Sequence, residues 1–331
     1  MVKSSLSKKV FLAIFLLLLL LICGYSIYIY LGLQKIEKVE IPQNNQELGI
    51  NSVHEENSYP DIRNIALFGI DTGRQKSDPP HSDSIIILTI DKLHNKLKIS
   101  SILRDSYVFI DGHGQTKITE AYTYGGPFLA IKTLNQNFNL DIKEYITVDF
   151  KGLSKIVDAL GGVDIDVKSQ EIKEINKWTK ELAHMQNVKP TYIKRSGLQH
   201  LNGIQAVAYS RIRNLGSGEF ERTARQRTVL TALFNNFKEM DITSFPSLVW
   251  QVTPYVSTNI STNELILLGS SLLISPPPLE QMRFPVDGYC KGTIISGTWY
   301  LTMKPDIKTT ADQITNYIYN DLIPQAKKPL F

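Results

Sequence analysis

The sequence predicts an α/β fold with a mixed central sheet flanked by helices, an α/β/α sandwich. Three short runs rich in Ile and bounded by Gly, Pro, Asp or Asn, at 62–69, 84–91 and 96–103, are typical of strands. Apolar residues at helical spacing, as at 127–138 and 221–240, predict helices between and after such runs. Strands and helices alternate without internal repeats, which indicates the α/β class.

The first 33 residues have the pattern of a membrane anchor. Residues 11–33 carry no charge and are long enough to cross a hydrocarbon layer of about 30 Å as a helix. Lysines precede this segment, so the positive-inside rule assigns residues 1–10 to the cytoplasm. The alternative is a cleaved secretory signal, whose apolar region is usually about 7–15 residues long. We expect an uncleaved anchor and a single-pass type II protein in the cell membrane, with its folded part extracellular.

Beyond the anchor, residues 34–60 are polar and predict an extracellular stalk, followed by one extracellular catalytic domain at 61–326. With the three lysines of the cytoplasmic tail set aside, 33 of the 36 basic residues remain against 32 acidic ones. This near-neutral exported part argues against nucleic-acid binding. Cys23 in the anchor cannot pair with Cys290 in the domain, so no disulfide framework is expected.

The remaining elements follow in order along the domain. A hairpin at 91–95 would join the second and third strands, and a helix at 152–160 is stopped by two glycines. The Lys/Glu-rich helix around 171–183 is expected to be peripheral, and the helix at 202–209 to lead into the arginine-rich segment. Further strands are predicted at 145–150, 163–167, 281–286 and 298–303, and further helices at 261–274 and 310–322.

Arginine is concentrated in one segment. The chain has ten arginines, and five of them lie between Arg211 and Arg227. Arg222, Arg225 and Gln226 follow i, i+3, i+4 spacing on the opening turns of a helix, where free N–H groups already favour an anion. Guanidinium groups bind phosphate oxygens in pairs, so the segment predicts an anion clamp. The alternative is pairing with carboxylates on a solvated face.

Two aspartates stand at the ends of neighbouring predicted strands. Asp71 follows the first strand and Asp83 precedes the second, so both carboxylates can meet at one edge of the sheet, where ligands of open α/β folds bind. Two carboxylates with few other protein ligands suit Mg²⁺, which borrows oxygens from a bound phosphate. Aspartate is also a common turn residue, so this pattern alone is a weak signal.

Other motifs add one candidate and exclude several chemistries. Arg104 and Asp105 stand at the end of the third strand, where an internal ion pair is the alternative to a site. No Ser-His-Asp, Cys-His or zinc-ligand spacing is present. The six histidines without metal-ligand spacing are His54, His81, His94, His113, His184 and His200.

Taken in order, these segments resemble the LytR-CpsA-Psr family of cell-wall glycopolymer transferases. The resemblance covers roughly 61–237 and rests on an ordered set of short motifs together with a single anchor. The matching motifs are Gly69-Ile70-Asp71, Ser82-Asp83-Ser84, Ser101 to Asp105, Lys117-Ile118, Ala121-Tyr122, Gly125-Gly126, Val157 to Val163, Leu201-Asn202-Gly203, Tyr209 to Arg213 and Arg222 to Gln226.

The resemblance implies a membrane-anchored phosphotransferase that moves a glycopolymer phosphate, such as wall teichoic acid or a capsular or secondary polysaccharide. The donor would be a polyprenyl-pyrophosphate carrier, with its lipid in an apolar tunnel, and the acceptor a peptidoglycan sugar hydroxyl. It implies Mg²⁺, with Mn²⁺ as a substitute, held by Asp71 and Asp83. The residues that it implies for the pyrophosphate are Arg104, Lys117, Arg211, Arg213, Arg222, Gln226 and His81, and those implied in catalysis are Arg104, Arg211, Arg213, Arg222, Asp83 and Glu219.

Two positions depart from the pattern of the family. His81 stands where many relatives have arginine, and histidine is cationic only in mildly acidic conditions. Glu219 stands where relatives commonly have aspartate, which changes its reach by one methylene. Either Asp83 or Glu219 could take the proton of the acceptor hydroxyl. Displacing a phosphate from a pyrophosphate builds charge on oxygens, so arginines and Mg²⁺ suit the reaction better than a covalent nucleophile.

Two other functions fit the same residues. A polyprenyl-pyrophosphate pyrophosphatase would use water as the acceptor. A non-catalytic regulator of the cell envelope or polymer-binding module would need the basic cluster but no turnover.

Overall fold

The computed structural model describes residues 24, 26–28, 30–31, 36–51, 59–72 and 79–330. Most of the predicted anchor at 11–33 and the whole predicted cytoplasmic tail at 1–10 lie outside these residues. Within the described part of the chain, no helix combines the length and the apolar character that a membrane crossing requires. The anchor therefore stays a prediction.

A mixed sheet of seven strands forms the centre of the described chain, in the order β1-β10-β7-β2-β3-β4-β11. The antiparallel neighbours β2, β3 and β4 lie in the middle, while β7 is parallel to β2 and β11 is parallel to β4. This confirms the predicted α/β class. The strands are β1 (Glu37–Lys38), β2 (Ile62–Asp71), β3 (His81–Asp91), β4 (Lys96–Ile102), β7 (Glu144–Asp149), β10 (Val256–Thr258) and β11 (Leu279–Phe284).

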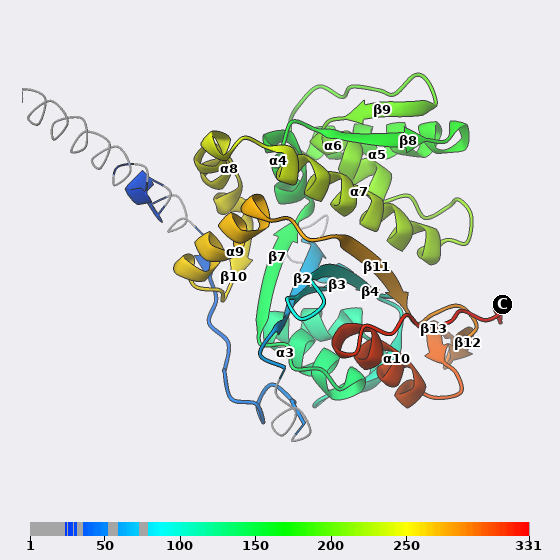
Figure 1. Cartoon of the computed structure of the whole chain (residues 1–331). Coiled ribbons are helices and arrows are strands. Elements are labelled where there is room, and N and C mark those ends of the chain that lie inside the picture. Colours follow the sequence, from blue (N-terminus) through cyan, green and yellow to red (C-terminus); the bar gives the residue numbers. More distant parts are fainter. Residues whose placement is uncertain are drawn as a thin grey trace, which may run out of the picture.

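Helices cover both faces of the sheet, as Figure 1 shows. Alternate residues of β2 point to opposite faces, because strand side chains have a period of two. Phe68 packs with α3 (Thr119–Phe138) and α10 (Ile307–Tyr319), whereas Ile65 lies in a second core with residues of α7 (Glu219–Glu239) and α9 (Thr262–Ile274). Because α7 covers this second face, the arginine-rich segment at its start lies over the sheet.

A separate unit stands beside the sheet. It consists of the hairpin β8 (Val163–Val167) and β9 (Gly197–Leu201), the helices α4 (Phe150–Ala159), α5 (Ile172–Met185) and α6 (Gly203–Ser210), and part of α7, around a core of their apolar residues. The strand predicted at 163–167 forms, but it pairs with β9 rather than joining the central sheet. Gly203 allows α6 to approach α4, because a Cβ there would lie 1.9 Å from the Ser154 carbonyl oxygen.

Several boundaries differ from the sequence prediction for local reasons. Asp149 accepts a hydrogen bond from Gly152 N, which caps α4 and makes Phe150 the first helical residue instead of the last strand residue. α3 begins at Thr119, not at 127, and bends at two glycines. The further elements are the hairpins β5 (Tyr107–Ile110)–β6 (Gly114–Lys117) and β12 (Cys290–Ile295)–β13 (Thr298–Met303), and α8 (Phe245–Val252).

Part of the predicted stalk packs on the domain. In the described residues 36–51, Ile41, Leu48 and Ile50 are buried in the core around α3. Asn135 Nδ2 donates to the Leu48 carbonyl oxygen at 2.9 Å. This portion of the segment at 34–60 is thus held against the domain rather than standing free of it.

Candidate functional site

A cavity of about 560 Å³ opens at the edge of the sheet where β2 ends and β3 begins. Its walls come from strands of the sheet, from the loop between α6 and α7, and from the first turns of α7. Nine of the ten residues predicted for the site line it, and the tenth, Glu219, contacts two of them. Those nine are Asp71, His81, Asp83, Arg104, Lys117, Arg211, Arg213, Arg222 and Gln226.

Asp71 and Asp83 reach the cavity from adjacent strands. Asp71, at the end of β2, pairs with His81 at the start of β3. The register then shifts, and Asp83 has no opposite residue on β2. Such a bulge bends the strand and turns a side chain toward a site. The strands approach closely there, since a Cβ on Gly69 would lie 3.0 Å from the Cβ of Ser84. The predicted meeting of the two aspartates at one sheet edge is confirmed.

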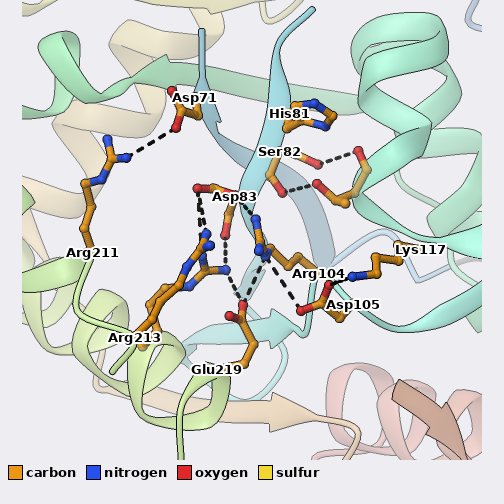
Figure 2. A network of polar contacts seen from close by, with 12 residues as sticks. Asp71, His81, Ser82, Asp83, Arg104, Asp105, Lys117, Arg211, Arg213 and Glu219 are labelled. Atoms are coloured by element: carbon orange, nitrogen blue, oxygen red, sulfur yellow. Dashed lines mark hydrogen bonds and ion pairs between the residues drawn. The ribbon is translucent and has the colours of Figure 1, made fainter. Parts of the chain in front are cut away.

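Asp83 is the centre of an arginine cluster, shown in Figure 2. Arg104 donates a hydrogen bond to its Oδ1, while Arg213 Nη2 and Arg222 Nη1 lie 3.2 and 3.8 Å from its Oδ2. Burial acts to raise the pKa of Asp83, but the three guanidinium charges outweigh it and hold that pKa below its ordinary value. Asp83 is therefore ionised at neutral pH.

Arg222 is buried beneath this cluster, with its side chain 2% exposed. Its Nη2 donates to the Asp83 carbonyl oxygen at 3.0 Å and also to the Glu219 carboxylate. Burial lowers the pKa of Arg222 to about 10, so the guanidinium keeps its charge at neutral pH. Arg104 Nε lies 3.5 Å from Glu219 Oε1. Glu219 thus ties the start of α7 to the end of β4.

The pKa values of Glu219 and Asp83 are shifted in opposite directions. Burial raises the pKa of Glu219 above its ordinary value, although Arg222 and Arg104 oppose this shift. A carboxylate with a raised pKa is the better proton acceptor near neutral pH, whereas one with a lowered pKa is better suited to hold a cation.

Arg211 lies between two aromatic rings on the far side of the cavity. Its guanidinium carbon is 4.1 Å from the centre of the Phe150 ring and 4.5 Å from the Trp178 ring. Its Nη2 is 3.4 Å from Asp71 Oδ2. The rings fix the plane of the guanidinium, which leaves its edge for an oxygen ligand. Trp178 belongs to α5, so the expectation that this helix is peripheral was wrong.

Lys117 and His81 complete the wall opposite Arg211. Lys117 Nζ lies 2.7 Å from Asp105 Oδ1, and Asp105 is itself 3.8 Å from Arg104 Nε. His81 Nδ1 is 2.9 Å from Thr123 Oγ1, and its side chain is half-exposed. Gln226 lines the cavity, and its implied contact with the pyrophosphate stays a prediction.

α6 ends at Ser210, so that Arg211 is its C-cap residue and Arg213 lies in the loop that leads to α7. α6 begins in a capping box in which Asn202 and Gln205 bond each other's backbone N–H groups. The loop then turns at Gly216 and Gly218, both at positive φ, and α7 starts at once.

The five clustered arginines do not act as one clamp. Arg211, Arg213 and Arg222 line the cavity, but Arg225 and Arg227 do not. Arg225 bonds Glu171 Oε1 at 2.8 Å, so it pairs with a carboxylate as the alternative expects, but both side chains are buried and do not lie on a solvated face. Its partner lies 54 positions away in the sequence, and local spacing could not reveal it.

The cavity is balanced in charge. The cationic residues that line it are Arg104, Lys117, Arg211, Arg213 and Arg222, and the anionic ones in or against it are Asp71, Asp83, Asp105, Glu120 and Glu219. A diphosphate would add negative charge to this balanced site. A divalent cation between Asp71 and Asp83 would compensate for it, and two carboxylates are the donors that Mg²⁺ prefers. The residues present therefore fit such an ion.

A second acidic group lies at the other end of β3. Ligand atoms of Asp91, His94 and Asp321 are within 4.8 Å of one another, which suits a metal. However, the ammonium of Lys98 lies 2.7 Å from Asp91 Oδ2 and 3.0 Å from Asp321 Oδ1. This buried ammonium already compensates both carboxylates, so the geometry favours a structural network.

Comparison with known families decides the relationship. The model of the LytR_cpsA_psr family matches residues 26–316. The chain belongs to this family. The matched range includes every residue of the cavity, the arginine-rich loop and the whole central sheet.

Curated LytR_cpsA_psr relatives carry two kinds of names. The teichoic acid transferase TagU of Bacillus anthracis is 29% identical over 88% of this chain and 92% of its own length. TagV of Bacillus subtilis is 32% identical over 63% of this chain, which spans about half (51%) of TagV. The regulatory protein MsrR of Staphylococcus aureus is 31% identical over 62% of this chain and 60% of its own length.

Solved structures share the fold. Bacillus subtilis TagT has a TM-score of 0.63 and 25% identity, covering 80% of this chain and 91% of TagT. TagT bound to LI-WTA has a TM-score of 0.64 and 25% identity, covering 80% of this chain and 91% of TagT. TagT with bound octaprenyl pyrophosphate lipid has a TM-score of 0.59 and 25% identity, covering 78% of this chain and 91% of TagT.

Proposed function

We propose that this protein is a phosphotransferase that attaches an anionic glycopolymer, wall teichoic acid or a capsular or secondary polysaccharide, to peptidoglycan. The donor is a polyprenyl-pyrophosphate-linked polymer. The observation that carries the proposal is the convergence of Arg104, Arg211, Arg213 and Arg222 with two aspartates on one cavity. Relatives named as polyisoprenyl-teichoic acid–peptidoglycan transferases, and a relative with bound octaprenyl pyrophosphate, support it.

The proposal includes the location of the reaction. Residues 11–33 anchor the chain in the cell membrane, residues 1–10 are cytoplasmic, and the catalytic domain at 61–326 is outside the cell. A lipid-linked donor and a cell-wall acceptor meet only on that side of the membrane.

The arginines bind and orient the diphosphate. Arg211, held flat between Phe150 and Trp178, presents its edge to one phosphate. Arg104 and Arg213, which now bond the two oxygens of Asp83, turn toward the oxygens of the other phosphate. Charge that develops on these oxygens during transfer is stabilised by guanidinium groups fixed in advance.

Asp71 and Asp83 would hold Mg²⁺, or Mn²⁺ in its place. The ion would neutralise charge on the bridging and terminal phosphate oxygens. The lowered pKa of Asp83 keeps one ligand ionised over the whole physiological range.

Glu219 accepts the proton of the acceptor hydroxyl. The hydroxyl oxygen attacks phosphorus, the bond to the leaving polyprenyl phosphate breaks, and the polymer keeps the transferred phosphate. Of the two candidates, Glu219 has the raised pKa and Asp83 the lowered one. A raised pKa makes a carboxylate the stronger base, which favours Glu219.

A non-catalytic role in regulation is the second candidate, because one relative is named a regulatory protein. A pure binder needs the arginines but gains nothing from a base of raised pKa beside them. Hydrolysis of the lipid diphosphate with water as acceptor would use the same residues.

Product analysis separates these functions. The full chain in detergent is supplied with a lipid-linked glycopolymer diphosphate, Mg²⁺ and peptidoglycan oligomers, and the products are separated by mass spectrometry. We expect a polymer–peptidoglycan conjugate that retains one phosphate, together with polyprenyl monophosphate. Free polymer phosphate in equal yield with and without the acceptor would establish a hydrolase, and absence of any turnover would favour the regulator.

A further inference from the structure

A second cavity of about 560 Å³ lies on the other side of α7 from the first. At about 3.6 residues per turn, Phe220, Ala224 and Arg227 fall on one side of the helix and Arg222 and Gln226 on the opposite side. The first set lines the second cavity and the second set the first. The remaining wall comes from the loop before α7 and its first turn, the end of β11, the turn after it, the start of β12 and the C-terminal segment, namely Ser217, Glu221, Arg283, Asp287, Gly288, Cys290, Pro329 and Leu330.

The C-terminal segment is fastened across this cavity. Lys327 N donates to the Asp287 carbonyl oxygen at 2.9 Å, and Lys327 Nζ lies 4.5 Å from the centre of the Tyr289 ring. Figure 1 shows this segment running back past β11 toward β12 and β13. The cavity therefore lies between α7 on one side and the fastened C-terminal segment on the other.

Two arginines in this cavity have unused donors. The Nη1 atoms of Arg227 and Arg283 are buried, and neither has a hydrogen-bond partner among the described residues. Burial, together with the nearby charge of Arg283, lowers the pKa of Arg227 to about 10. A buried guanidinium donor without an acceptor is costly, so a ligand that supplies oxygens would be stabilised.

The carboxylates of the cavity are paired with arginines other than Arg227. Asp287 Oδ1 lies 2.5 Å from Arg283 Nη2, and Glu221 Oε2 lies 3.5 Å from Arg225 Nη2. No ion pair links Arg227 to a carboxylate of the described residues. Arg283 is also stacked on Phe220, at 4.3 Å from the ring centre, which fixes the direction of its free donor.

We propose that this cavity is a second anion site, in which Arg227 and Arg283 bind one phosphate group. Two guanidinium groups can bond different oxygens of one phosphate group, which offers three acceptor oxygens where a carboxylate offers two. Free phosphate is one source of the group. The other is a phosphodiester of the glycopolymer itself, an assignment that rests on the proposed function. The helix between the cavities is about 10–12 Å across, which a few phosphodiester repeats span.

The site is tested with inorganic phosphate on the full chain in detergent, with Arg211→Gln and Arg213→Gln disabling the first cavity. At constant ionic strength, calorimetric titration should still detect binding. Adding Arg227→Gln should raise Kd at least tenfold, and adding Arg195→Gln should leave it within twofold, because Arg195 is exposed and lies outside both cavities. No phosphate binding, or equal Kd values in all variants, would overturn the proposal.

Two matched substitutions at Ala224 control for the possibility that a variant fails to fold. Ala224 lines the cavity without contributing a charge. Ala224→Asp adds a carboxylate facing the phosphate and Ala224→Asn adds a neutral group of the same size. We expect Ala224→Asp to raise Kd at least fivefold over Ala224→Asn, with equal melting temperatures. Equal Kd values in the two variants would contradict a phosphate site here.

The source of the phosphate is decided with a synthetic oligomer of glycerol phosphate, in the chain with both cavities intact. If the polymer supplies the group, the oligomer binds at least tenfold more tightly than inorganic phosphate, and Arg227→Gln removes this gain. A gain absent in the wild type, with the phosphate titration still positive, assigns the site to free phosphate. These titrations measure no turnover, so their failure leaves the proposed transferase reaction untouched.

Discussion

The two ends of β3 make an instructive comparison, because each carries a largely buried aspartate that is paired with basic side chains. Asp83 near its start contacts three arginines, and Asp91 at its end contacts Lys98 and His94. Both have a lowered pKa. At each aspartate, burial raises the pKa. The arginine charges at Asp83 and the Lys98 hydrogen bond at Asp91 lower the pKa by more than burial raises it.

The two ends of β3 differ in whether their basic side chains are accessible to a ligand. Lys98 is fully buried, and its ammonium is bonded to Asp91, to the Tyr317 and Ile318 carbonyl oxygens and to Asp321. At the other end a cavity opens beside the aspartate, and the Nε atoms of Arg104 and Arg222 have no hydrogen-bond partner in the part of the chain that is described. A closed cluster of this kind stabilises the fold, whereas arginines that line an open cavity can bind a ligand.

The largest expected effects separate the two ends. Asp91→Asn removes one of the two carboxylates that compensate buried Lys98, and breaking a buried pair costs up to about 3–5 kcal/mol. We expect a large drop in melting temperature with normal turnover per folded molecule. Because the pKa of Asp91 is lowered in the fold, its stabilisation is present above the ordinary aspartate pKa and lost as pH falls through the lowered value. Melting curves of the variant should lack this acid-dependent loss.

Asp83→Asn should have the converse outcome. It weakens the arginine cluster and removes a proposed metal ligand, so kcat/KM is expected to fall by about 10²-fold or more. The melting temperature should change much less than in Asp91→Asn, because the cavity admits water. If Asp83→Asn melts as early as Asp91→Asn and turns over normally when folded, the distinction between the ends is wrong.

Next in size are the arginines that contact Asp83. Arg104→Ala and Arg213→Ala should each lower turnover at least about tenfold, since each removes a charge-assisted contact to the transferring phosphate. Steady-state assays with the exposed Arg195→Ala as the control check this. Near-normal rates in both variants would count against the site.

A pH profile sharpens the assignment of the base. Glu219 must be deprotonated to accept a proton, and its raised pKa means that activity is lost on acidification at a higher pH than an ordinary glutamate would give. Glu219→Gln should lower kcat and remove this acidic limb, whereas Glu219→Asp should keep a limb at a shifted position. An unchanged limb in Glu219→Gln would assign the base elsewhere.

The smallest effect is expected at Trp178. Trp178→Ala removes one of the two rings that hold Arg211, and a cation–π contact that borders an open cavity is worth about 0.5–1 kcal/mol. KM for the lipid-linked donor should rise about two- to fivefold, with kcat nearly unchanged. Trp178→Phe should restore most of the affinity, which a general packing defect would not explain.

The sequence predicted much of this site, because its residues stand at strand and helix ends whose order follows from local patterns. Asp71 and Asp83 could be placed together once their strands were taken as neighbours. The bulge at Asp83 and the aromatic rings around Arg211 could not be foreseen, because they depend on register and on the packing of α5. The separation of Arg225 from the clamp likewise depends on Glu171, a partner distant in sequence.

Binding of a short-chain prenyl diphosphate to the full chain tests the central claim most directly. Its Kd is measured with and without Mg²⁺ in the wild type, Asp71→Asn and Arg211→Gln. The account predicts that Mg²⁺ lowers Kd at least tenfold in the wild type, that Asp71→Asn loses this gain, and that Arg211→Gln binds weakly throughout. A Kd that is the same with and without Mg²⁺ in all three proteins would contradict a diphosphate held jointly by the arginines and the two aspartates.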